Sequence, residues 1–353
     1  MTQTQYIKLK LQLFQNLIQK NKLDGFLVTN HLDQFYLTDF MFYPGETVLL
    51  VSKKKTVCFT RSLYLEQLKN LTPYMEVIGD DVDRLSHAMK YVKKLGLKAV
   101  GFDAAKEAYL TGKMLVKNGC KEMGSFIAQM REQKNAKELK LMRASNQLAY
   151  LTYEYIKPRI KTGMTETQVA AEMERFMRAA GASTTSFATI VAFGEGASDP
   201  HHVTGERKLK TEECILIDFG CVYKGYCSDM TRSWWHGKKV PAEYTKIWNL
   251  VNRARREGIK AVCPGRTGQQ VDRVSRSIIE QAGYGDYFTH RTGHGVGIEI
   301  HEEPCNSQQC TAKLVEGNVV TVEPGIYLPG KYGVRLEDTV AVSKKGAVIL
   351  TRK

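Results

Sequence analysis

The chain has 353 residues, more than a single hydrophobic core usually organises, so we expect two domains. Its composition, 43% hydrophobic and 25% charged residues, is that of an ordinary soluble protein, and its apolar runs are too short to span a bilayer, which excludes an integral membrane protein. The formal net charge of +14 comes from dispersed lysines and arginines without zinc-finger or RNA-binding motifs, so we expect a solvated basic surface and no nucleic-acid partner.

The first twenty residues, MTQTQYIKLKLQLFQNLIQK, lack the apolar core and the small-residue cleavage site of a secretory signal. Their pattern predicts an amphipathic helix. The eight cysteines include no CxxC pair, and a chain of this length does not need disulfide bonds to fold. We therefore expect free thiols, a cytoplasmic location and no membrane partner.

Short apolar strands alternate with helical patterns over the first part of the chain. The predicted strands are residues 25–29, 48–51, 57–60 and 99–102, and the predicted helices are residues 63–71 and 84–95. This alternation predicts a small α/β domain. The following segment 130–156 is polar at first and then strongly helical. We place the boundary just before it, which gives domains 1–124 and 125–353.

The second domain contains an internal echo, GMTETQVAAEMERFMRAAG (163–181) and GRTGQQVDRVSRSIIEQAG (265–283). Glycine, threonine, valine, alanine and glycine recur in it at the same offsets. Each copy predicts a helix that a threonine caps and a glycine ends. The echo favours an α+β domain built by duplication, with a pseudo-twofold axis and a cleft near that axis.

Two aspartates stand in a predicted hairpin, CILIDFGCVYKGYCSDMTR (214–232). If its turn is centred on Tyr223 and Lys224, Asp218 and Asp229 lie directly opposite each other, beside aliphatic residues. Like charges in such a pair destabilise a sheet, and burial adds to the cost. A bound cation would remove the repulsion.

Two glutamates occupy a comparable place in VVTVEPGIYLPGKYGVRLEDTVAV (319–342). A turn centred on Gly330 would bring Glu323 opposite Glu337, although a Pro-Gly pair interrupts the first strand. Between the hairpins, HRTGHGVGIEIHEEP (290–304) carries three histidines among glycines, which let the backbone approach a ligand closely. Taken singly, each residue is more simply a strand end, a turn or a structural histidine.

In this order and number, however, four acids and a histidine predict an oxygen-rich site for two divalent metal ions per chain. Bridging carboxylates allow two cations to share the four negative charges. Such a pair lowers the pKa of a water molecule and clamps a tetrahedral intermediate. Oxygen ligands favour manganese, with cobalt, zinc or iron as alternatives.

The chain resembles the pita-bread metallopeptidases, a family that includes aminopeptidase P, prolidase and methionine aminopeptidase. The resemblance spans nearly the whole chain and rests on DFGCVYKGYCSDMTR, GHGVGIEIHEEP, VEPGIYLPG and GVRLED. It implies five metal ligands, which are Asp218, Asp229, His294, Glu323 and Glu337. Asp218 would hold one metal, and His294 and Glu323 would hold the other. Asp229 and Glu337 would bridge them, and Glu323 would also act as the general base.

Three further histidines match the aminopeptidase P pattern, and these are His201, His290 and His301. The resemblance implies that they bind substrate and stabilise the tetrahedral intermediate. His201 matches the family position, so we expect the adjacent His202 to be structural. Tyr327 and Arg335 match positions that support the metal or the substrate.

The N-terminal domain favours the proline-specific branch, because methionine aminopeptidases usually lack such a domain. Its segment GFLVTNHLDQFYLTDF resembles a family segment that carries glycine in place of Asp39. The complete ligand set argues against a creatinase and against the non-enzymatic pita-bread relatives that bind histones or nucleic acid. The resemblance therefore implies peptide substrates with proline in second position and a homodimer or larger homo-oligomer.

Substrate length is a separate question. A dipeptidase must bind the free carboxylate beside the proline, most naturally through an arginine. In prolidases an arginine often follows the His-Glu-Xaa-Pro segment, but here Cys305 stands at that place. We therefore expect an Xaa-Pro aminopeptidase of the aminopeptidase P type. An Xaa-Pro dipeptidase (prolidase) is the alternative, with its cation supplied from elsewhere, for example by Arg61 or by a neighbouring subunit.

Overall fold

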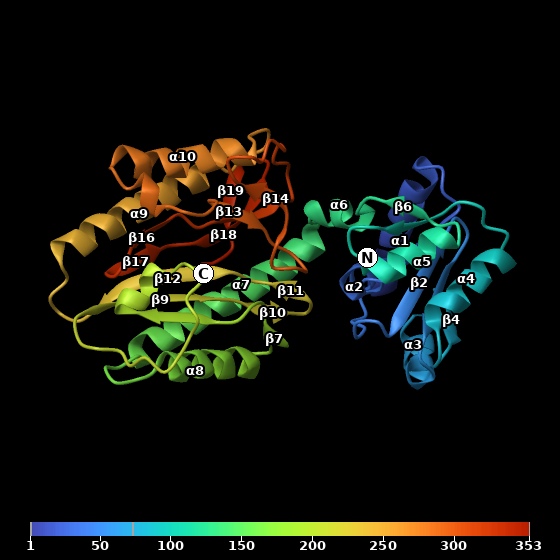
Figure 1. Cartoon of the computed structure of the whole chain (residues 1–353), viewed down its shortest axis with the longest axis horizontal. Coiled ribbons are helices and arrows are strands. Elements are labelled where there is room, and N and C mark those ends of the chain that lie inside the picture. Colours follow the sequence, from blue (N-terminus) through green and yellow to red (C-terminus); the bar gives the residue numbers. More distant parts are fainter. Residues whose placement is uncertain (1, 73, 353) are drawn as a thin grey trace. The chain divides into compact units, whose positions relative to one another are not determined.

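The computed structural model describes residues 2–72 and 74–352 of the chain (Figure 1). The chain divides into two compact units, Met1–Arg131 and Glu132–Lys353, and each has its own hydrophobic core. The predicted boundary between residues 124 and 125 falls just before helix α6 (Phe126–Glu132). That the two domains meet at this boundary as separately folding units stays a prediction.

The N-terminal unit is built on a six-stranded sheet in the order β4-β3-β2-β1-β5-β6. Its strands are β1 (Gly25–Val28), β2 (Thr47–Ser52), β3 (Thr56–Thr60), β4 (Glu76–Gly79), β5 (Val100–Asp103) and β6 (Lys121–Met123). Its helices are α1 (Gln3–Lys20), α2 (His31–Thr38), η1 (Ser62–Tyr64), α3 (Leu65–Leu71), α4 (Arg84–Lys94), α5 (Tyr109–Lys117) and α6. The strands and helices predicted for this part are all present, with their ends slightly shifted.

The ends of two helices in this unit have clear causes. The predicted amphipathic helix is confirmed as α1, which begins with a capping box between Thr2 and Gln5 and buries Phe14 and Ile18. Helix α2 ends at Asp39, whose φ of 60° is the left-handed conformation that glycine usually supplies. Asp39 therefore ends this helix in the left-handed conformation without a glycine. In the described part of the chain, no helix combines the length and the hydropathy needed to cross a membrane.

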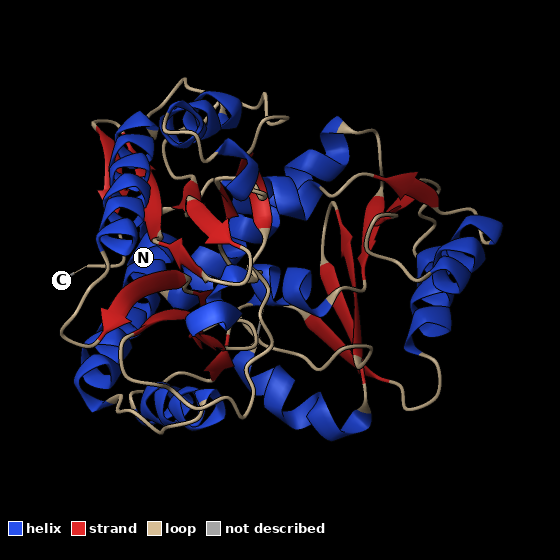
Figure 2. Ribbon diagram, turned by 60° about the vertical axis from the view of Figure 1, so that its left-hand side comes forward, coloured by secondary structure: helices blue, strands red, loops and turns tan. Residues whose placement is uncertain are grey.

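The C-terminal unit places strands between two pairs of helices (Figure 2). Its helices are α7 (Ala136–Ile156), η2 (Lys157–Arg159), α8 (Glu166–Ala179), η3 (Gly194–Ser198), α9 (Ala242–Ala261), α10 (Gly268–Gln281) and η4 (Gly285–Tyr287). The first half contributes β7 (Thr184–Thr185), β8 (Ile190–Phe193), β9 (Glu213–Phe219), β10 (Cys221–Tyr223), β11 (Tyr226–Cys227) and β12 (Met230–His236). The second half contributes β13 (Gly293–Gly295), β14 (Glu302–Asn306), β15 (Val319–Val322), β16 (Gly325–Leu328), β17 (Tyr332–Arg335), β18 (Asp338–Ser343) and β19 (Gly346–Ile349).

The two predicted copies fold alike. Helices α8 and α10 begin at Thr165 and Thr267, and each threonine forms a capping box with a glutamine three residues on. Each capping threonine also makes an isolated β-bridge, to Lys208 in one copy and to Lys313 in the other. The glycines before and after each helix have positive φ. Agreement at this level of backbone detail is what a duplicated structure shows.

The register predicted for the first hairpin is wrong. Strands β9 and β12 pair Asp218 with Thr231, and Asp229 lies just before β12, outside the ladder. The cause is the turn, which is formed by Lys224 and Gly225 with φ values of 49° and 81°. Two successive residues with positive φ make a type I′ turn, which favours glycine at its centre. The pair Lys224-Gly225 contains a glycine, whereas the predicted pair Tyr223-Lys224 does not. Moving the turn by one residue shifts every cross-strand partner by two.

The register predicted for the second hairpin is correct, on both sides of the Pro-Gly interruption. Strands β16 and β17 pair Gly325 with Arg335, and β15 and β18 pair Val322 with Asp338. The proline, which has no N–H group to donate, stands in the gap between β15 and β16. Glu323 and Glu337 therefore leave the ladders at equivalent points and are free to turn toward the same space.

Candidate active site

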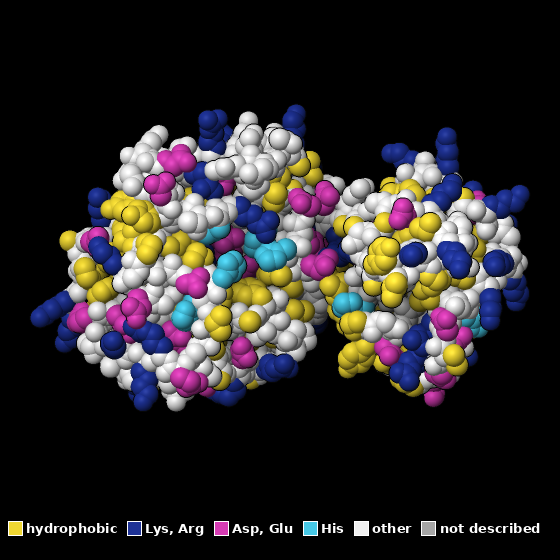
Figure 3. Space-filling view, viewed as in Figure 1, with side chains coloured by type: hydrophobic (Ala, Val, Ile, Leu, Met, Phe, Trp, Pro, Cys, Tyr) yellow, Lys and Arg dark blue, Asp and Glu magenta, His cyan; other side chains and the backbone are white. Residues whose placement is uncertain are grey.

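A cavity of about 620 Å³ opens in the C-terminal unit. In Figure 3, histidine and acidic side chains gather around a recess on the face of this unit. The predicted site residues that line the cavity are Asp218, Asp229, His294, Glu323, Glu337, His201, His290, His301 and Arg335. Tyr327 is buried beside it and contacts His290 and Arg335. The structure thus brings together residues from both halves of the duplicated unit.

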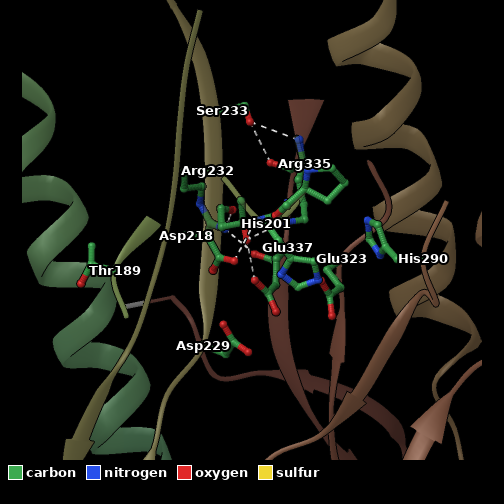
Figure 4. A network of polar contacts seen from close by, with 12 residues as sticks. Thr189, His201, Asp218, Asp229, Arg232, Ser233, His290, Glu323, Arg335 and Glu337 are labelled. Atoms are coloured by element: carbon green, nitrogen blue, oxygen red, sulfur yellow. Dashed lines mark hydrogen bonds and ion pairs between the residues drawn. The ribbon is translucent and has the colours of Figure 1, made fainter. Parts of the chain in front are cut away.

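The carboxylates come from strands and from breaks next to strands. Asp218 belongs to β9, whereas Asp229, Glu323 and Glu337 stand where β12, β15 and β18 begin or end. A residue in such a break has no ladder partner, so its side chain is not confined to one face of a sheet. Figure 4 shows the four carboxylates gathered around one space.

His294 is oriented by its own backbone environment. Its Nδ1 lies 3.0 Å from the carbonyl oxygen of Gly295 and must donate to it, since a carbonyl only accepts. The opposite nitrogen, Nε2, lies 3.4 Å from Oδ2 of Asp229 and 3.5 Å from Oε1 of Glu323. An imidazole held in this tautomer presents Nε2 as a metal ligand.

Burial and mutual repulsion oppose ionisation of the acids. Burial raises the pKa of Asp229 and of Glu337 well above the usual range, and the repulsion between neighbouring carboxylates raises both further. Burial also raises the pKa of Glu323, although His294 and Arg335 oppose the shift. Without another positive charge, the protein would have to keep part of this cluster protonated.

Two oxygen atoms of the cluster have no protein partner. Among the residues that the structure describes, neither Oδ1 of Asp218 nor Oε1 of Glu337 accepts a hydrogen bond, although both atoms are buried. Ligand atoms of Asp229, His294 and Glu337 also lie within 4.8 Å of one another. Buried acceptors without donors, in a cluster with excess negative charge, fit a bound divalent cation.

Arg335 supports this cluster from behind. Its Nη2 lies 2.7 Å from Oδ2 of Asp218, and its Nη1 lies 2.8 Å from the hydroxyl of Tyr327 and 3.2 Å from the carbonyl oxygen of Pro200. Its Nε lies 3.1 Å from Oγ1 of Thr231. Because these bonds occupy the guanidinium, Arg335 holds Asp218 and the segment that carries His201. A direct contact with substrate stays a prediction.

Two of the predicted substrate histidines are neutral near pH 7. Burial, with the charge of Arg335, lowers the pKa of His290 to about 3. Limited hydration of the ring, with the nearby His294 and Arg291, lowers the pKa of His301 to about 4. Both nitrogens of His290 are engaged, Nε2 with the hydroxyl of Tyr327 and Nδ1 with a backbone carbonyl. His301 packs its ring edge-on against His294, with centroids 4.4 Å apart.

The adjacent histidines His201 and His202 have different environments. His201 is exposed in the cavity, and no hydrogen bond joins its ring to another described residue. Nε2 of His202 lies 2.8 Å from Oε2 of Glu166, a buried residue in the first turn of α8. Glu166 also accepts from the backbone N–H groups of Phe193 and Gly205. The geometry agrees with a structural His202, and the catalytic part of His201 stays a prediction.

Three residues of the site were not predicted from the sequence, and these are Thr231, Thr321 and Arg291. Oγ1 of Thr231 donates to Oε2 of Glu337, and Oγ1 of Thr321 donates to Oε1 of Glu323 and accepts from the N–H of His294. Arg291 lines the cavity, and its place in the HRTGHG motif was visible in the sequence. The two threonines carried no comparable signal, because a threonine on a strand is usually a packing residue.

Two family models match the chain. Residues 140–344 match Metallopeptidase family M24, and residues 10–133 match the Creatinase/Prolidase N-terminal domain. The chain belongs to metallopeptidase family M24. The predicted family and the predicted fold, a duplicated pita-bread domain preceded by a smaller α/β domain, are thereby confirmed. Members of this family use divalent metals, which agrees with the donor set of the cavity.

Relatives of this M24 chain include both named and unnamed peptidases. The uncharacterized peptidase YqhT of Bacillus subtilis is 34% identical over 348 residues, which are 97% of this chain and 98% of that protein. An Xaa-Pro dipeptidase from Bacillus anthracis has a similar structure, with a TM-score of 0.93, 33% identity and coverage of 98% of each chain. An X-Pro aminopeptidase from Thermotoga maritima has a TM-score of 0.87 with 31% identity, over 94% of this chain and 96% of that chain.

Proposed function

We propose that the protein is a metal-dependent peptidase that hydrolyses the Xaa-Pro bond at the N-terminus of peptides. The observation that carries this proposal is the cavity itself, in which four carboxylates and His294 meet His201, His290 and His301. The chain is similar over nearly its full length to a solved Xaa-Pro dipeptidase and to a solved X-Pro aminopeptidase, and this similarity supports the specificity for proline.

The ligand set divides naturally between two cations. Asp218 would hold one, His294 and Glu323 would hold the other, and Asp229 and Glu337 would be shared. Hard carboxylate oxygens in this proportion favour Mn²⁺. When bound, divalent ions supply Lewis acidity, which lowers the pKa of water and polarises a carbonyl group.

The residues of the chain carry the remaining chemistry. Glu323 accepts the proton of the attacking water, because Thr321 holds one of its oxygens and leaves the other available. His201 and His301 donate hydrogen bonds to the substrate as charge develops on the scissile carbonyl. His290, with both nitrogens engaged, keeps Tyr327 in place and contributes a neutral wall to the cavity.

Hydrolysis assays test this proposal directly. The protein, supplied with Mn²⁺, is expected to cleave the bond between the first alanine and proline in Ala-Pro and in Ala-Pro-Ala. It should leave Ala-Ala and Ala-Ala-Ala nearly unchanged. A chelator is expected to abolish the activity, and added Mn²⁺ to restore it. Equal turnover of the proline and alanine peptides would contradict the proposed specificity.

The sequence favours the aminopeptidase form of this activity, whereas one feature of the structure favours the dipeptidase form. Arg291 lines the cavity and is exposed, and its side chain makes no hydrogen bond or ion pair with another described residue. Its charge contributes to the lowered pKa of His301, which places the guanidinium near that ring. Arg291 is thus a free cation for the carboxylate of an Xaa-Pro dipeptide, the group that Cys305 cannot bind.

Variants of Arg291 distinguish the two forms. If the enzyme is a dipeptidase, Arg291→Met is expected to raise KM for Ala-Pro about 10- to 100-fold, the size of a lost charged hydrogen bond, and to change KM for Ala-Pro-Ala little. Arg291→Lys, which keeps the charge, is the matched control. If wild type prefers Ala-Pro-Ala and the variant cleaves both peptides as before, the aminopeptidase form holds.

We further propose, following the family resemblance, that the enzyme works in the cytoplasm as a homodimer or larger homo-oligomer. Sedimentation of the active protein tests the assembly. A fully active monomer at assay concentrations would exclude it.

A further inference from the structure

A second group of metal-type ligands lies in the C-terminal unit. It consists of Glu303, Cys305 and Cys310, and one carboxylate oxygen and the two sulfur atoms all lie within 4.8 Å of one another. None of these three described residues lines the cavity of the candidate active site. Their chemistry also differs from that of the cavity, because two of the three donors are sulfur.

The local backbone explains why the three side chains meet. Glu303 and Cys305 both belong to β14, and the ligand atoms of their side chains lie within 4.8 Å of each other. The chain then reverses in a tight turn, in which the N–H of Cys310 donates to the carbonyl oxygen of Ser307 over 3.1 Å. This turn returns Cys310 to the strand that carries the other two residues.

The turn is anchored to the folded unit. The backbone N–H of Gln269, at the start of α10, donates to the carbonyl oxygen of Cys310 over 2.8 Å, and its side chain donates to the carbonyl oxygen of Gln308 over 2.7 Å. At the strand end, Nδ2 of Asn306 donates to the carbonyl oxygen of Thr321 over 3.0 Å. Ligands held in this way lose little conformational entropy when they bind an ion.

The geometry suits a tetrahedral cation bound through sulfur. A Zn–S bond of about 2.3 Å and tetrahedral angles place two sulfur ligands about 3.8 Å apart, which fits within the observed spread of the three donors. Cys310 is buried, Cys305 is half-buried and Glu303 is exposed, so an ion can enter from the Glu303 side and lose its water toward Cys310. Glu132, near Glu303, adds negative charge at that entrance.

We propose that Glu303, Cys305 and Cys310 form a binding site for a soft divalent cation of the zinc type, separate from the catalytic centre. Thiolate ligands select Zn²⁺ over Mn²⁺, so the two sites take different metals. A water molecule completes the tetrahedron. Strand β14 begins directly after His301, so the bound ion connects the strand next to this proposed substrate-binding histidine to the turn that is hydrogen-bonded to the start of α10.

Binding must displace protons. Burial, with the adjacent Cys305, raises the pKa of the Cys310 thiol to about 11. Because the metal binds the thiolate, its affinity falls as the pH falls. Zn²⁺ is therefore expected to bind more weakly at pH 6 than at pH 8.

Cobalt serves as a spectroscopic probe of the proposed site. The full-length protein is kept reduced by a thiol-free reductant, loaded first with Mn²⁺ and then titrated with Co²⁺. Thiolate-to-Co²⁺ charge transfer absorbs in the near ultraviolet. The residues that line the catalytic cavity include no cysteine, so this absorbance reports Co²⁺ bound outside that cavity, and the serine variants assign it to the proposed site. We expect it to saturate near one equivalent of Co²⁺ and to disappear when Zn²⁺, but not more Mn²⁺, is added.

Three variants and a control decide the assignment. Cys305→Ser and Cys310→Ser are each expected to abolish the absorbance, and Glu303→Gln, at an exposed position, to lower the Co²⁺ affinity about tenfold. Cys263→Ser, at a half-buried cysteine outside the cluster, is expected to change nothing. Circular dichroism verifies that each variant is folded. The proposal is overturned if reduced wild type shows no absorbance, if the absorbance survives in both serine variants, or if the two thiols form a disulfide under these conditions.

Discussion

Nη2 of Arg335 lies 2.7 Å from Oδ2 of Asp218, and the arginine side chain is only 3% exposed (Figure 4). This ion pair holds one carboxylate of the cluster by its Oδ2 and leaves its Oδ1, which has no partner among the described residues, available to the proposed metal ion. The arginine therefore orients a proposed metal ligand and also offsets part of the negative charge of the cluster.

Arg335→Met is expected to lower the free energy of unfolding by about 3–5 kcal/mol, the usual cost of leaving a buried charge without its partner. It should also weaken metal binding. Denaturant unfolding and metal analysis measure the two effects. Arg352→Met is the matched control, because Arg352 is half-exposed and lies 3.8 Å from Asp338, so its loss should cost less than about 1 kcal/mol. If both variants lose a similar amount of unfolding free energy, the Arg335–Asp218 pair stabilises the fold no more than an exposed ion pair does.

Glu337→Gln is expected to abolish metal binding and activity, yet to leave the metal-free protein more stable than wild type at pH 7. Burial and the neighbouring Asp229 raise the pKa of Glu337, so the folded state is penalised once the pH exceeds the ordinary carboxyl pKa. The variant removes that penalty, so its free energy of unfolding without metal at pH 7 should exceed that of wild type. Urea unfolding of the metal-free proteins measures this difference in stability. Glu316→Gln, at an exposed glutamate, is the control. A destabilised Glu337→Gln protein would argue against the repulsion.

His301→Ala and His201→Ala are each expected to lower kcat by about 10²–10³-fold, the loss of a donor to developing charge, with metal content unchanged. His202→Ala should act differently, because its partner is Glu166 rather than the substrate. We expect it to lower thermal stability and to affect kcat by less than about tenfold. Loss of metal from the His301 variant would instead identify that histidine as a ligand.

The lowered pKa of His290, a half-buried residue, predicts a dependence of stability on pH. The pKa of His290 is lowered to about 3 in the folded protein, whereas in the unfolded chain it is about 6.5. Between pH 6.5 and pH 3 the histidine is therefore protonated in the unfolded state and neutral in the folded state. Its contribution is therefore fully present above pH 6.5 and is lost progressively as the pH falls toward 3. In His290→Gln, the difference in unfolding free energy between pH 7 and pH 5 should shrink by about 2 kcal/mol. An unchanged difference would show that His290 titrates normally.

Much of the site could be predicted from local motifs. Asp218, His294 and Glu337 stand in short segments whose residue types and order already indicate metal ligands, and the structure brings these segments to one cavity. The register of the second hairpin also followed from its sequence, because the loop around Gly330 determines which residues pair. Patterns of this kind depend on residues that are neighbours in the chain, and so they can be read before the chain is folded.

The rest depended on which segments meet. Thr231, not Asp229, lies opposite Asp218, because two residues with positive φ moved the turn by one position and no polarity pattern marked that shift. The motif around Arg291 was visible in the sequence, but not that its side chain would line the cavity without a partner among the described residues, and nothing in the sequence indicated that Cys305 meets Cys310. Whether a charge is paired, and whether two sulfur atoms meet, is decided by packing between distant segments. Only the tertiary structure sets those distances, and the energies of these groups depend steeply on them.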